Sequence, residues 1–275
     1  MIVRAALVQM TSGLDPAVNA RAATARIAEA AALGAQFVLT PEMTGVVDGK
    51  QDRILTRVRN EADDQVLAQL RAEAKKSGVW LLIGSLAVTV AGSDKLANRS
   101  FLVDPDGAIR ARYDKIHLFD VDLPSGERYR ESSTYQPGSQ AVVAETPWAK
   151  IGLSICYDLR FAHLYRALAQ AGAAILTVPA AFTKVTGEAH WHTLLRARAI
   201  ETGCYVLAPA QTGLHEDGRR TFGHSLAVAP WGEVLADGGD RPGVNVVDID
   251  LQRVAEARRR IPAMMHDRDF EVSAA

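Results

Sequence analysis

The sequence has few cysteines, few aromatic residues and almost no net charge. Two of its 275 residues are cysteine, Cys156 and Cys204, which is too few for a disulfide framework. Aromatic residues make up 6% of the chain, and 31 basic residues nearly cancel 32 acidic ones, leaving a formal net charge of −1. Such a chain lacks the basic surface of nucleic-acid-binding proteins and the polybasic segments of membrane-surface proteins. We therefore expect no nucleic-acid partner and no membrane attachment.

Long apolar segments are also lacking. The longest run without a charged residue is 167–183, which is interrupted by Gln170 and Pro179. It is shorter than the roughly 20 apolar residues that a membrane-spanning helix needs. The apolar residues near the N-terminus are broken by Gln9 and do not resemble an export signal. Together with the few cysteines, these absences predict a reducing, cytoplasmic location.

Short apolar segments alternate with segments of helical periodicity on both sides of an irregular loop at 114–140. This alternation predicts an α/β fold. Because the pairs of predicted strands at 97–113 and 224–236 resemble hairpins rather than βαβ units, we expect two mixed sheets face to face, with helices outside. No linker divides the chain, so residues 1–275 are interpreted as a single domain whose tail, from about 261, packs on the domain or on a partner subunit. Strands are predicted at 3–8, 37–39, 79–90, 100–103, 108–113, 151–155, 174–178, 205–208, 225–229, 233–236 and 244–249, and helices at 16–33, 63–77, 161–171 and 188–202.

Cys156 is the first candidate for chemistry. It follows the apolar strand 151–155 and precedes the segment 157–160, which we expect to open a helix. A thiol at a strand-to-helix turn is exposed as a nucleophile and lies near a helix N-terminus, which favours the thiolate. An inert, buried cysteine is an equally good interpretation of this residue taken alone. Cys204 precedes a strand without such a context, and we assign it to the core.

Two charged residues also stand at the ends of apolar strands. Glu42 follows the strand 37–39, where partial burial raises the pKa of a carboxyl group toward the range of a general base. Lys115 follows the strand 108–113, and a buried ammonium group stabilises a developing oxyanion. Each residue alone is better explained as a charge that faces a loop. Three reactive groups at strand ends on one side of a sheet would instead form a site.

Other hydrolase chemistries find less support in the sequence. None of the seven histidines can be paired with Cys156 from the sequence, so a cysteine protease with a histidine base is left open. The segment 223–227 resembles a serine-hydrolase elbow, but Ala227 replaces the final glycine and a strand follows instead of a helix. His190 and His192 are two residues apart, not the four of a helical zinc pair. We therefore expect neither a serine esterase nor a metal hydrolase.

Three separated motifs resemble the Glu-Lys-Cys triad of the nitrilase superfamily of carbon-nitrogen hydrolases, in the same order and at strand ends. They are Pro41-Glu42, Lys115-Ile-His-Leu-Phe-Asp120 and Cys156-Tyr-Asp-Leu-Arg-Phe161. Further segments are similar to the branch that contains deaminated glutathione amidases and omega-amidases, so the resemblance covers nearly the whole chain. It implies a four-layer α-β-β-α sandwich that forms a homodimer or a higher homo-oligomer, with no metal and no organic cofactor. The further segments are 181–187, 189–191, 195–201, 223–225 and 230–234.

The resemblance also implies a role for each residue of the site. Cys156 would be the nucleophile, Glu42 the general base and Lys115 the oxyanion donor, with the backbone N–H of Tyr157 completing the oxyanion hole. Glu131 would orient Lys115 and the substrate amide. The reaction would form a thioester with loss of ammonia, and water activated by Glu42 would then release the acid. The complete triad favours an enzyme over a non-catalytic binding module of the same fold.

Substrates of this branch end in a carboxylate beside a keto group. Arg160 is the candidate partner for that carboxylate, unless it forms a salt bridge with Asp158 instead. Phe182, Thr183 and Thr186 lie in the predicted loop after the strand 174–178, where sheets of this kind bind ligands, and they are candidates for substrate binding.

Several segments favour deaminated glutathione amidases over omega-amidases within the branch. The resemblance thus implies hydrolysis of the primary amide of a small keto-acid compound, with deaminated glutathione as the first choice and metabolite repair as the purpose. An omega-amidase acting on α-ketoglutaramate, or a hydrolase of other small amides, N-carbamoyl compounds or nitriles, is the alternative. His192 departs from the pattern, because many relatives have glutamate there. The favouring segments are 168–172, 196–202 and 208–211.

Overall fold

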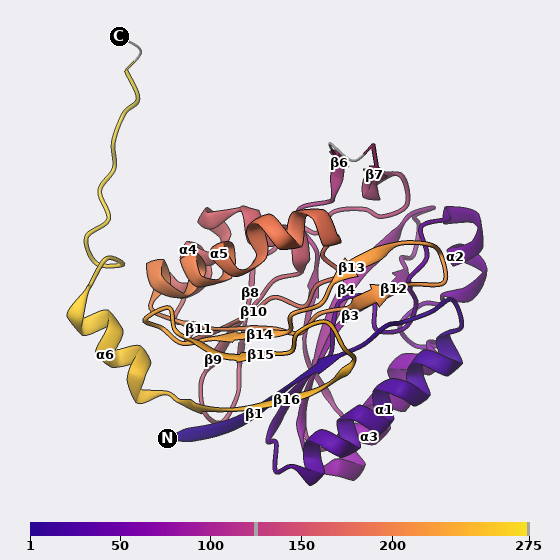
Figure 1. The fold of residues 1–275 in the computed structure, drawn as a ribbon, viewed down its shortest axis with the longest axis horizontal. Coiled ribbons are helices and arrows are strands. Elements are labelled where there is room, and N and C mark those ends of the chain that lie inside the picture. The colour runs from indigo at the N-terminus through magenta and orange to yellow at the C-terminus, as the bar shows by residue number, and fades with distance from the viewer. Residues whose placement is uncertain (124–125, 274–275) are drawn as a thin grey trace.

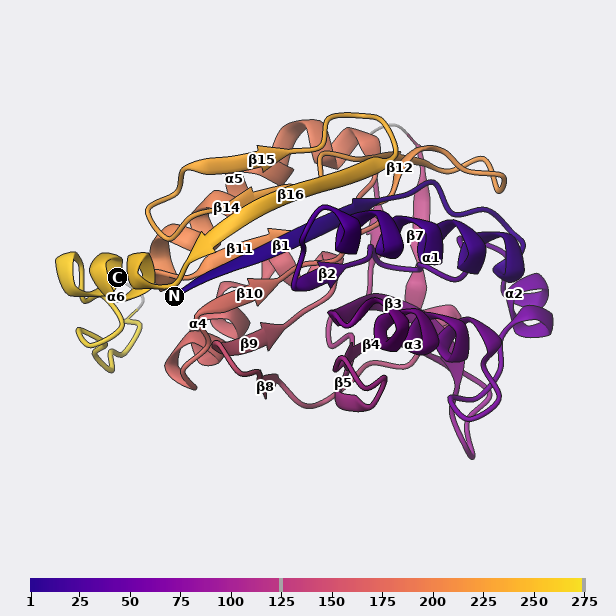
Figure 2. The same ribbon diagram turned by 90° about the horizontal axis from the view of Figure 1, so that it is seen from below.

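Two β-sheets lie face to face in the middle of the molecule, and helices cover the outer face of each sheet (Figures 1 and 2). The computed structural model describes residues 1–123 and 126–273. Within these residues each sheet has six strands, with three neighbouring parallel strands flanked by antiparallel ones. The predicted four-layer α-β-β-α arrangement is confirmed.

The first sheet is built mainly from the N-terminal part of the chain. β16 brings a distant segment into it and pairs with the whole of β1, from Ile2 opposite Asp250 to Gln9 opposite Gly243. In spatial order its strands are β16 (Gly243–Asp250), β1 (Ile2–Gln9), β2 (Phe37–Leu39), β3 (Trp80–Thr89), β4 (Leu96–Val103) and β5 (Ile109–Asp114).

The second sheet comes from the middle and later part of the chain. Its spatial order is β15 (Val234–Asp237), β14 (Leu226–Val228), β11 (Tyr205–Ala208), β10 (Ile175–Thr177), β9 (Lys150–Leu153) and β8 (Val142–Glu145). The helices α4 (Ala162–Gln170) and α5 (Lys184–Thr202) cover this sheet, and α1 (Pro16–Ala32) and α3 (Gln65–Ser77) cover the first one (Figure 2).

Both faces of the strands are buried, which explains their nearly continuous apolar sequences. Along β1, Val3, Ala5 and Leu7 face the second sheet, whereas Ala6 and Val8 pack under the helices of the first sheet. One set of strands therefore contributes to two cores, the one between the sheets and the one under α1 and α3. A charged residue just beyond the end of such a strand lies next to apolar side chains on two sides.

Short elements at the edges were not predicted. They lack a long apolar pattern: in α6, for example, Val254 and Ala257 are buried among exposed or half-buried arginines. β12 and β13 form a small two-stranded sheet, and β6 and β7 form a second one inside the predicted loop. These elements are α2 (Gln51–Arg57), β6 (Asp120–Asp122), β7 (Arg128–Arg130), η1 (Glu131–Ser133), the edge strand β8, β12 (Thr212–Leu214), β13 (Arg220–Phe222) and α6 (Gln252–Arg260). The 3-10 helix η2 (Cys156–Arg160) covers the segment that was expected to open a helix.

The start of α5 corrects one prediction. The helix begins at Lys184 rather than Glu188, so Thr186 lies in its first turn and not in a loop. Gly187 is the reason for the error, because glycine usually weakens a helix interior. Here it allows α5 to pack closely on β13, since a Cβ atom at Gly187 would lie 2.3 Å from the Phe222 ring.

The tail after Ile261 first contacts α4 and then leaves the body of the molecule (Figure 1). Arg166 forms an ion pair of 2.6 Å with Asp267, whereas Phe270 is 85% exposed. That a partner subunit covers the tail stays a prediction. No helix in the described ranges has the length and apolar character that crossing a bilayer requires.

Candidate active site

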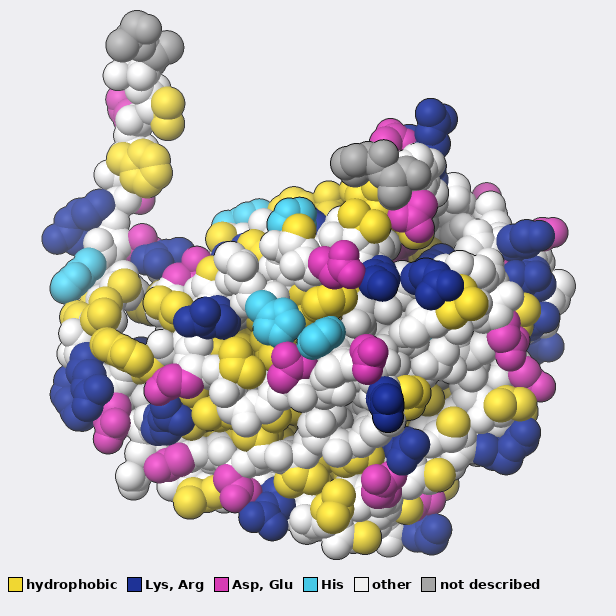
Figure 3. All heavy atoms as spheres, in the orientation of Figure 1, with side chains coloured by type: hydrophobic (Ala, Val, Ile, Leu, Met, Phe, Trp, Pro, Cys, Tyr) yellow, Lys and Arg dark blue, Asp and Glu magenta, His cyan; other side chains and the backbone are white. Residues whose placement is uncertain are grey.

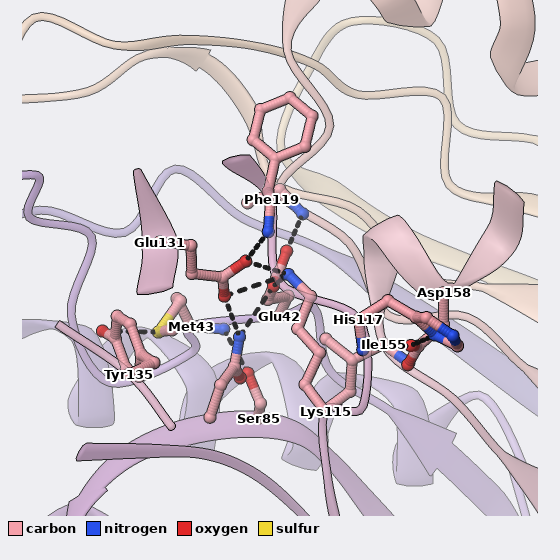
Figure 4. Close-up of polar contacts among 12 residues, drawn as sticks. Glu42, Met43, Ser85, Lys115, His117, Phe119, Glu131, Tyr135, Ile155 and Asp158 are labelled. Atoms are coloured by element: carbon pink, nitrogen blue, oxygen red, sulfur yellow. Dashed lines mark hydrogen bonds and ion pairs between the residues drawn. The ribbon is translucent and has the colours of Figure 1, made fainter. Parts of the chain in front are cut away.

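Glu42 lies in the turn after β2, and β3 fixes this turn from one side. A Cβ atom at Gly84 of β3 would lie 2.1 Å from the Thr40 carbonyl oxygen, so only glycine permits this close approach. The Ser85 hydroxyl accepts a 2.9 Å hydrogen bond from the Met43 N–H, which Figure 4 shows beside Glu42. The backbone on both sides of Glu42 is thus held against β3.

Lys115 directly follows β5, and its side chain is 2% exposed. Its Nζ atom lies 3.0 Å from Glu42 Oε1 and 2.8 Å from Glu131 Oε2 (Figure 4). Glu131 begins the 3-10 helix η1 and also accepts a 2.6 Å hydrogen bond from the Phe119 N–H. The structure therefore brings both predicted carboxylates to one buried ammonium group.

Cys156 occupies the turn after β9 and has a left-handed backbone conformation, with φ of 50°. Few residues other than glycine adopt this conformation, and it often marks functional sites. The Cys156 N–H donates a 2.9 Å hydrogen bond to the Pro179 carbonyl oxygen. The turn continues as the five-residue 3-10 helix η2, and α4 follows from Ala162, so the segment expected to open a helix forms a separate 3-10 turn before it.

Asp158 ties this turn to the segment that carries Lys115. Its completely buried carboxylate accepts hydrogen bonds from the Tyr113 hydroxyl at 2.6 Å, the His117 N–H at 3.0 Å and the Ile155 N–H at 2.9 Å. Figure 4 shows Asp158 beside His117 and Ile155. Within the described residues no ion pair joins it to Arg160, so the predicted alternative pairing of those two residues is wrong.

The charges of the triad depend on one another. Burial and the Glu42 carboxylate raise the pKa of the Cys156 thiol well above its usual value, although Lys115 lowers it in part. Burial also raises the pKa of Glu42, but Lys115 and hydrogen bonds from Cys156, Lys115 and Asn98 outweigh burial, so this pKa is lowered. Two expectations are thereby corrected: the site does not favour a resting thiolate, and the pKa of Glu42 is lowered and not raised.

At Lys115 the neighbouring charges also outweigh burial, and here they raise the pKa. Burial alone lowers it, but the carboxylates of Glu131 and Glu42 hold it well above its usual value. The resting centre therefore contains a neutral thiol, an ionised Glu42 and an ammonium group. These groups titrate as one coupled set.

Asn98 of β4 is a site residue that sequence reasoning missed. Its Nδ2 atom donates to Glu42 Oε1 at 2.9 Å and to Glu131 Oε1 at 3.2 Å. Its backbone carbonyl oxygen accepts the Lys115 N–H at 3.0 Å. A single asparagine in an apolar strand gives no periodic signal, and pairing of β4 with β5 is needed to bring it to the site.

A cavity of about 330 Å³ opens beside the triad, and Tyr157, Phe182, Thr183 and Thr186 line it. Arg160 is not part of this lining. Its guanidinium group lies over the rings of Tyr157 and Phe182, 5.8 and 5.4 Å from their centroids, which places it behind the wall of the cavity.

Three other arginines, Arg128, Arg130 and Arg219, line the cavity. Arg219 lies over the Tyr129 ring, and its Nη2 atom is 3.8 Å from Asp217 Oδ2. Sequence reasoning did not assign these three arginines to the site, because β7 and the loop before β13 carry no motif. Within the described residues, the one cluster of His, Cys, Asp or Glu with the spacing of metal ligands lies outside this cavity.

Comparison with known proteins identifies a family match over most of the chain. The family model described as carbon-nitrogen hydrolase matches residues 4–259. The chain is 44% identical over 237 residues to the deaminated glutathione amidase of Yersinia enterocolitica, covering 86% of this chain and 82% of that protein.

Solved structures agree with the fold. The NitFhit protein of C. elegans superposes with a TM-score of 0.91 and 37% identity, covering 97% of this chain and 65% of that one, so this chain spans less than two thirds of NitFhit. A variant of the amidase from Nesterenkonia sp. AN1, with acrylamide added at its active-site cysteine, gives a TM-score of 0.79 and 30% identity, covering 94% of this chain and 98% of that one.

Proposed function

The chain belongs to the carbon-nitrogen hydrolase family, and on this basis we propose that it is an amidase with Cys156 as nucleophile and deaminated glutathione as preferred substrate. The observation that carries the proposal is the buried contact of Glu42, Lys115 and Glu131 beside the thiol of Cys156. The 44% identity to a deaminated glutathione amidase supports this choice of substrate.

In the first half of the reaction, a proton leaves Cys156 Sγ for the Glu42 carboxylate while the sulfur attacks the amide carbon. The carbonyl oxygen becomes an oxyanion, which the Lys115 ammonium and the Tyr157 N–H stabilise. The C–N bond then breaks, and Glu42 gives its proton to the departing nitrogen. A thioester with Cys156 and a free amine result.

In the second half, Glu42 removes a proton from water while the water oxygen attacks the thioester. A second oxyanion forms at the same place, collapses to the carboxylic acid and expels the sulfur, which recovers its proton from Glu42. Glu131 and Asn98 hold Lys115 and Glu42 in position throughout. This cycle needs Glu42 ionised and the thiol protonated at the start, which agrees with their pKa directions.

The leaving group distinguishes the two main candidate substrates. In deaminated glutathione the amide nitrogen belongs to cysteinylglycine, so the released group is a dipeptide amine. In α-ketoglutaramate the nitrogen is a primary amide, and only there does the predicted release of ammonia apply. For deaminated glutathione the predicted primary amide and loss of ammonia are wrong, because the bond cleaved is a secondary amide. Both substrates deliver the same keto-acid acyl group to Cys156.

The cavity supports the larger substrate. Phe182, Thr183 and Thr186 are proposed to contact the substrate, whereas Arg128 and Arg219 supply positive charge for its terminal carboxylates. Arg160 lies behind Tyr157 and Phe182 and does not line the cavity, so we propose that it supports these wall residues and does not bind the substrate carboxylate as the sequence suggested.

Hydrolysis by the purified enzyme tests this function. Deaminated glutathione, α-ketoglutaramate, an N-carbamoyl amino acid and a simple nitrile are offered separately, and the acid product is measured by chromatography, with Cys156→Ala as the control. We expect the highest kcat/KM with deaminated glutathione. Preference for α-ketoglutaramate would instead support the omega-amidase alternative, and full activity of Cys156→Ala would contradict the mechanism.

We also propose that the protein works in the cytoplasm as a homodimer or higher homo-oligomer. Exposed apolar side chains support a subunit contact near α5 and α6: Ile200 is 55% exposed, Trp231 49% and Ile261 60%. They line a depression of about 530 Å³. The two buried thiols suit a reducing compartment, because neither forms a disulfide.

A further inference from the structure

A second polar cluster lies outside the catalytic cavity, where α5 meets the connection between β13 and β14 and the end of β15. His192 Nε2 is 2.9 Å from Asp237 Oδ2, and His224 Nδ1 is 2.8 Å from Asp237 Oδ1. One possible ligand atom from each of these residues lies within 4.8 Å of the others. Figure 3 shows histidine side chains gathered beside acidic ones on the face that carries α5.

The chemistry of these groups suits a transition-metal ion. Imidazole nitrogen and carboxylate oxygen are the usual ligands of zinc and related divalent ions, at about 2.0–2.2 Å. In a tetrahedral site with such bonds, ligand atoms are about 3.4 Å apart. The two contacts to Asp237 are already 2.9 and 2.8 Å long, so small side-chain rotations suffice to place an ion between the residues. The side chains of His192, His224 and Asp237 are 38, 28 and 35% exposed, which leaves a path for the ion and room for water.

The surrounding structure holds the ligands in place. His224 has a left-handed backbone conformation, with φ of 53°, and its N–H donates to the Gly239 carbonyl oxygen at 2.7 Å. Its carbonyl oxygen accepts a 2.8 Å hydrogen bond from Trp191 Nε1. The His224 ring is stacked on Phe222 with 4.3 Å between the ring centroids. A strained backbone and a stacked ring fix the direction of this imidazole, as ligand sites require.

We propose that His192, His224 and Asp237 bind one divalent transition-metal ion of the zinc class. The ion joins three elements that are distant in sequence: α5, the β13–β14 connection and the end of β15. It does not touch the reacting atoms. Its effect on the active site is indirect and passes through Phe222. The Phe222 ring stacks on His224, and the Phe222 N–H donates a 2.9 Å hydrogen bond to the carbonyl oxygen of Phe182 in the cavity wall.

Zinc titration by calorimetry tests the proposal, using full-length, metal-stripped protein. The Cys156→Ala background removes the active-site thiol, which would otherwise compete for zinc. We expect saturable binding of one ion and a rise in Tm of several degrees in saturating zinc. Asp237→Asn and His224→Asn in this background should each lose the binding, since asparagine tolerates the left-handed backbone of His224 but lacks an imidazole. His190→Ala, two residues from His192 on the same helix, is the matched control and should bind like the background.

Several outcomes would overturn the proposal. They are an absence of saturable zinc binding in the Cys156→Ala protein, and binding that persists unchanged in both Asp237→Asn and His224→Asn. Circular dichroism and Tm without zinc show whether each variant is folded. If His224→Asn does not fold, His192→Gln is used in its place. Zinc binding that His192→Gln retains would contradict the proposal in the same way.

Discussion

At the scale of single residues, the reaction depends on one proton shared between Cys156 and Glu42. Burial and Glu42 raise the pKa of the thiol, while Lys115 keeps the pKa of Glu42 low. The lowered pKa favours an ionised carboxylate before the reaction, and this base takes the proton as the sulfur attacks. Without the lysine, burial would raise the pKa of this glutamate and favour its protonated form, which cannot accept the thiol proton.

Replacing Glu42 by glutamine tests that role. Glutamine has nearly the same shape, and Glu131 still neutralises Lys115, but the amide cannot accept the thiol proton. We expect kcat to fall about 10²–10⁴-fold, the usual contribution of a general base, with little change in Tm. Initial rates and thermal unfolding of both proteins measure this. A loss of activity smaller than tenfold in a folded variant would contradict the assignment.

The Asn98 amide is expected to position the carboxylates. Asn98→Leu removes the donor to Glu42 and Glu131, and a hydrogen bond to a charged group contributes about 1.5–3 kcal/mol, so kcat should fall by about 10–100-fold. The lost hydrogen bond lowered the pKa of Glu42, so this pKa rises in the variant. Because the base must be ionised, the acid limb of the rate profile moves to higher pH.

Rates measured from acid to neutral pH reveal the shift. Ser100→Ala is the matched control on the same strand, since Ser100 is buried and its hydroxyl donates to the Ile83 carbonyl oxygen rather than to a carboxylate. A variant of Asn98 with an unshifted acid limb would show that the residue has only a structural role.

Sequence reasoning reached the residues that belong to motifs and missed those that do not. Glu42, Lys115, Cys156 and Glu131 were predicted from their resemblance to a family, and the structure places them together. Asn98 depends on strand register, which no local pattern encodes. The pKa of Glu42 was predicted in the wrong direction because the strand-end position indicates burial but not the direct hydrogen bonds from Lys115 and Asn98.

At the scale of elements, β3 acts as the support for the Glu42 turn. Gly84→Ala would bring a Cβ atom to 2.1 Å from the Thr40 carbonyl oxygen and 2.5 Å from that of Pro41, so backbone must shift. We expect this variant to lose about 1–3 kcal/mol of stability, as overpacked sites do, and also to lose activity through displacement of Glu42.

Chemical denaturation and initial rates check this prediction. Gly243→Ala in β16 is the control, because a Cβ atom there meets no atom within 4 Å. Wild-type stability and rate in Gly84→Ala would show that the turn does not depend on β3.

Elements with a long apolar pattern were predicted well, and the others were not. β1, α1 and α3 agree with their predicted ranges to within about two residues. The predicted start of α5 was too late because Gly187 was taken as a residue that weakens a helix. Its close packing against the Phe222 ring is not visible in the sequence. A close contact between distant elements is invisible to local periodicity.

At the scale of the whole molecule, the depression beside α5 and α6 is where we expect subunits to meet. Ile200→Glu with Trp231→Glu places two charges on side chains that are 55 and 49% exposed in the single chain. Burying unpaired charge in an interface is costly, so the double variant should be monomeric. Leu55→Glu, on α2 and 39% exposed, is the control and should leave assembly unchanged.

Size-exclusion chromatography with light scattering measures the mass of each protein. A double variant with the same oligomeric mass as the wild type would place the interface elsewhere, and a monomeric wild type would contradict the proposed assembly.

The layers of the molecule were predictable because hydrophobic alternation and hairpin spacing determine which segments become strands and which connections are short. The pairing of β1 with β16 was not predictable from the sequence. These strands lie some 240 residues apart in the chain, and edge pairing depends on how the complete sheets close. The cavity was not predictable either, because loops from distant parts of the chain line it, including those near Arg128 and Arg219.

Intact-protein mass spectrometry of enzyme quenched during turnover tests the thioester mechanism most directly. Deaminated glutathione and α-ketoglutaramate share an acyl group, so both should add the same mass to the wild-type protein, located on Cys156, and neither should label Cys156→Ala. An adduct that retains the leaving nitrogen, an adduct on another residue, or turnover by Cys156→Ala would contradict the mechanism.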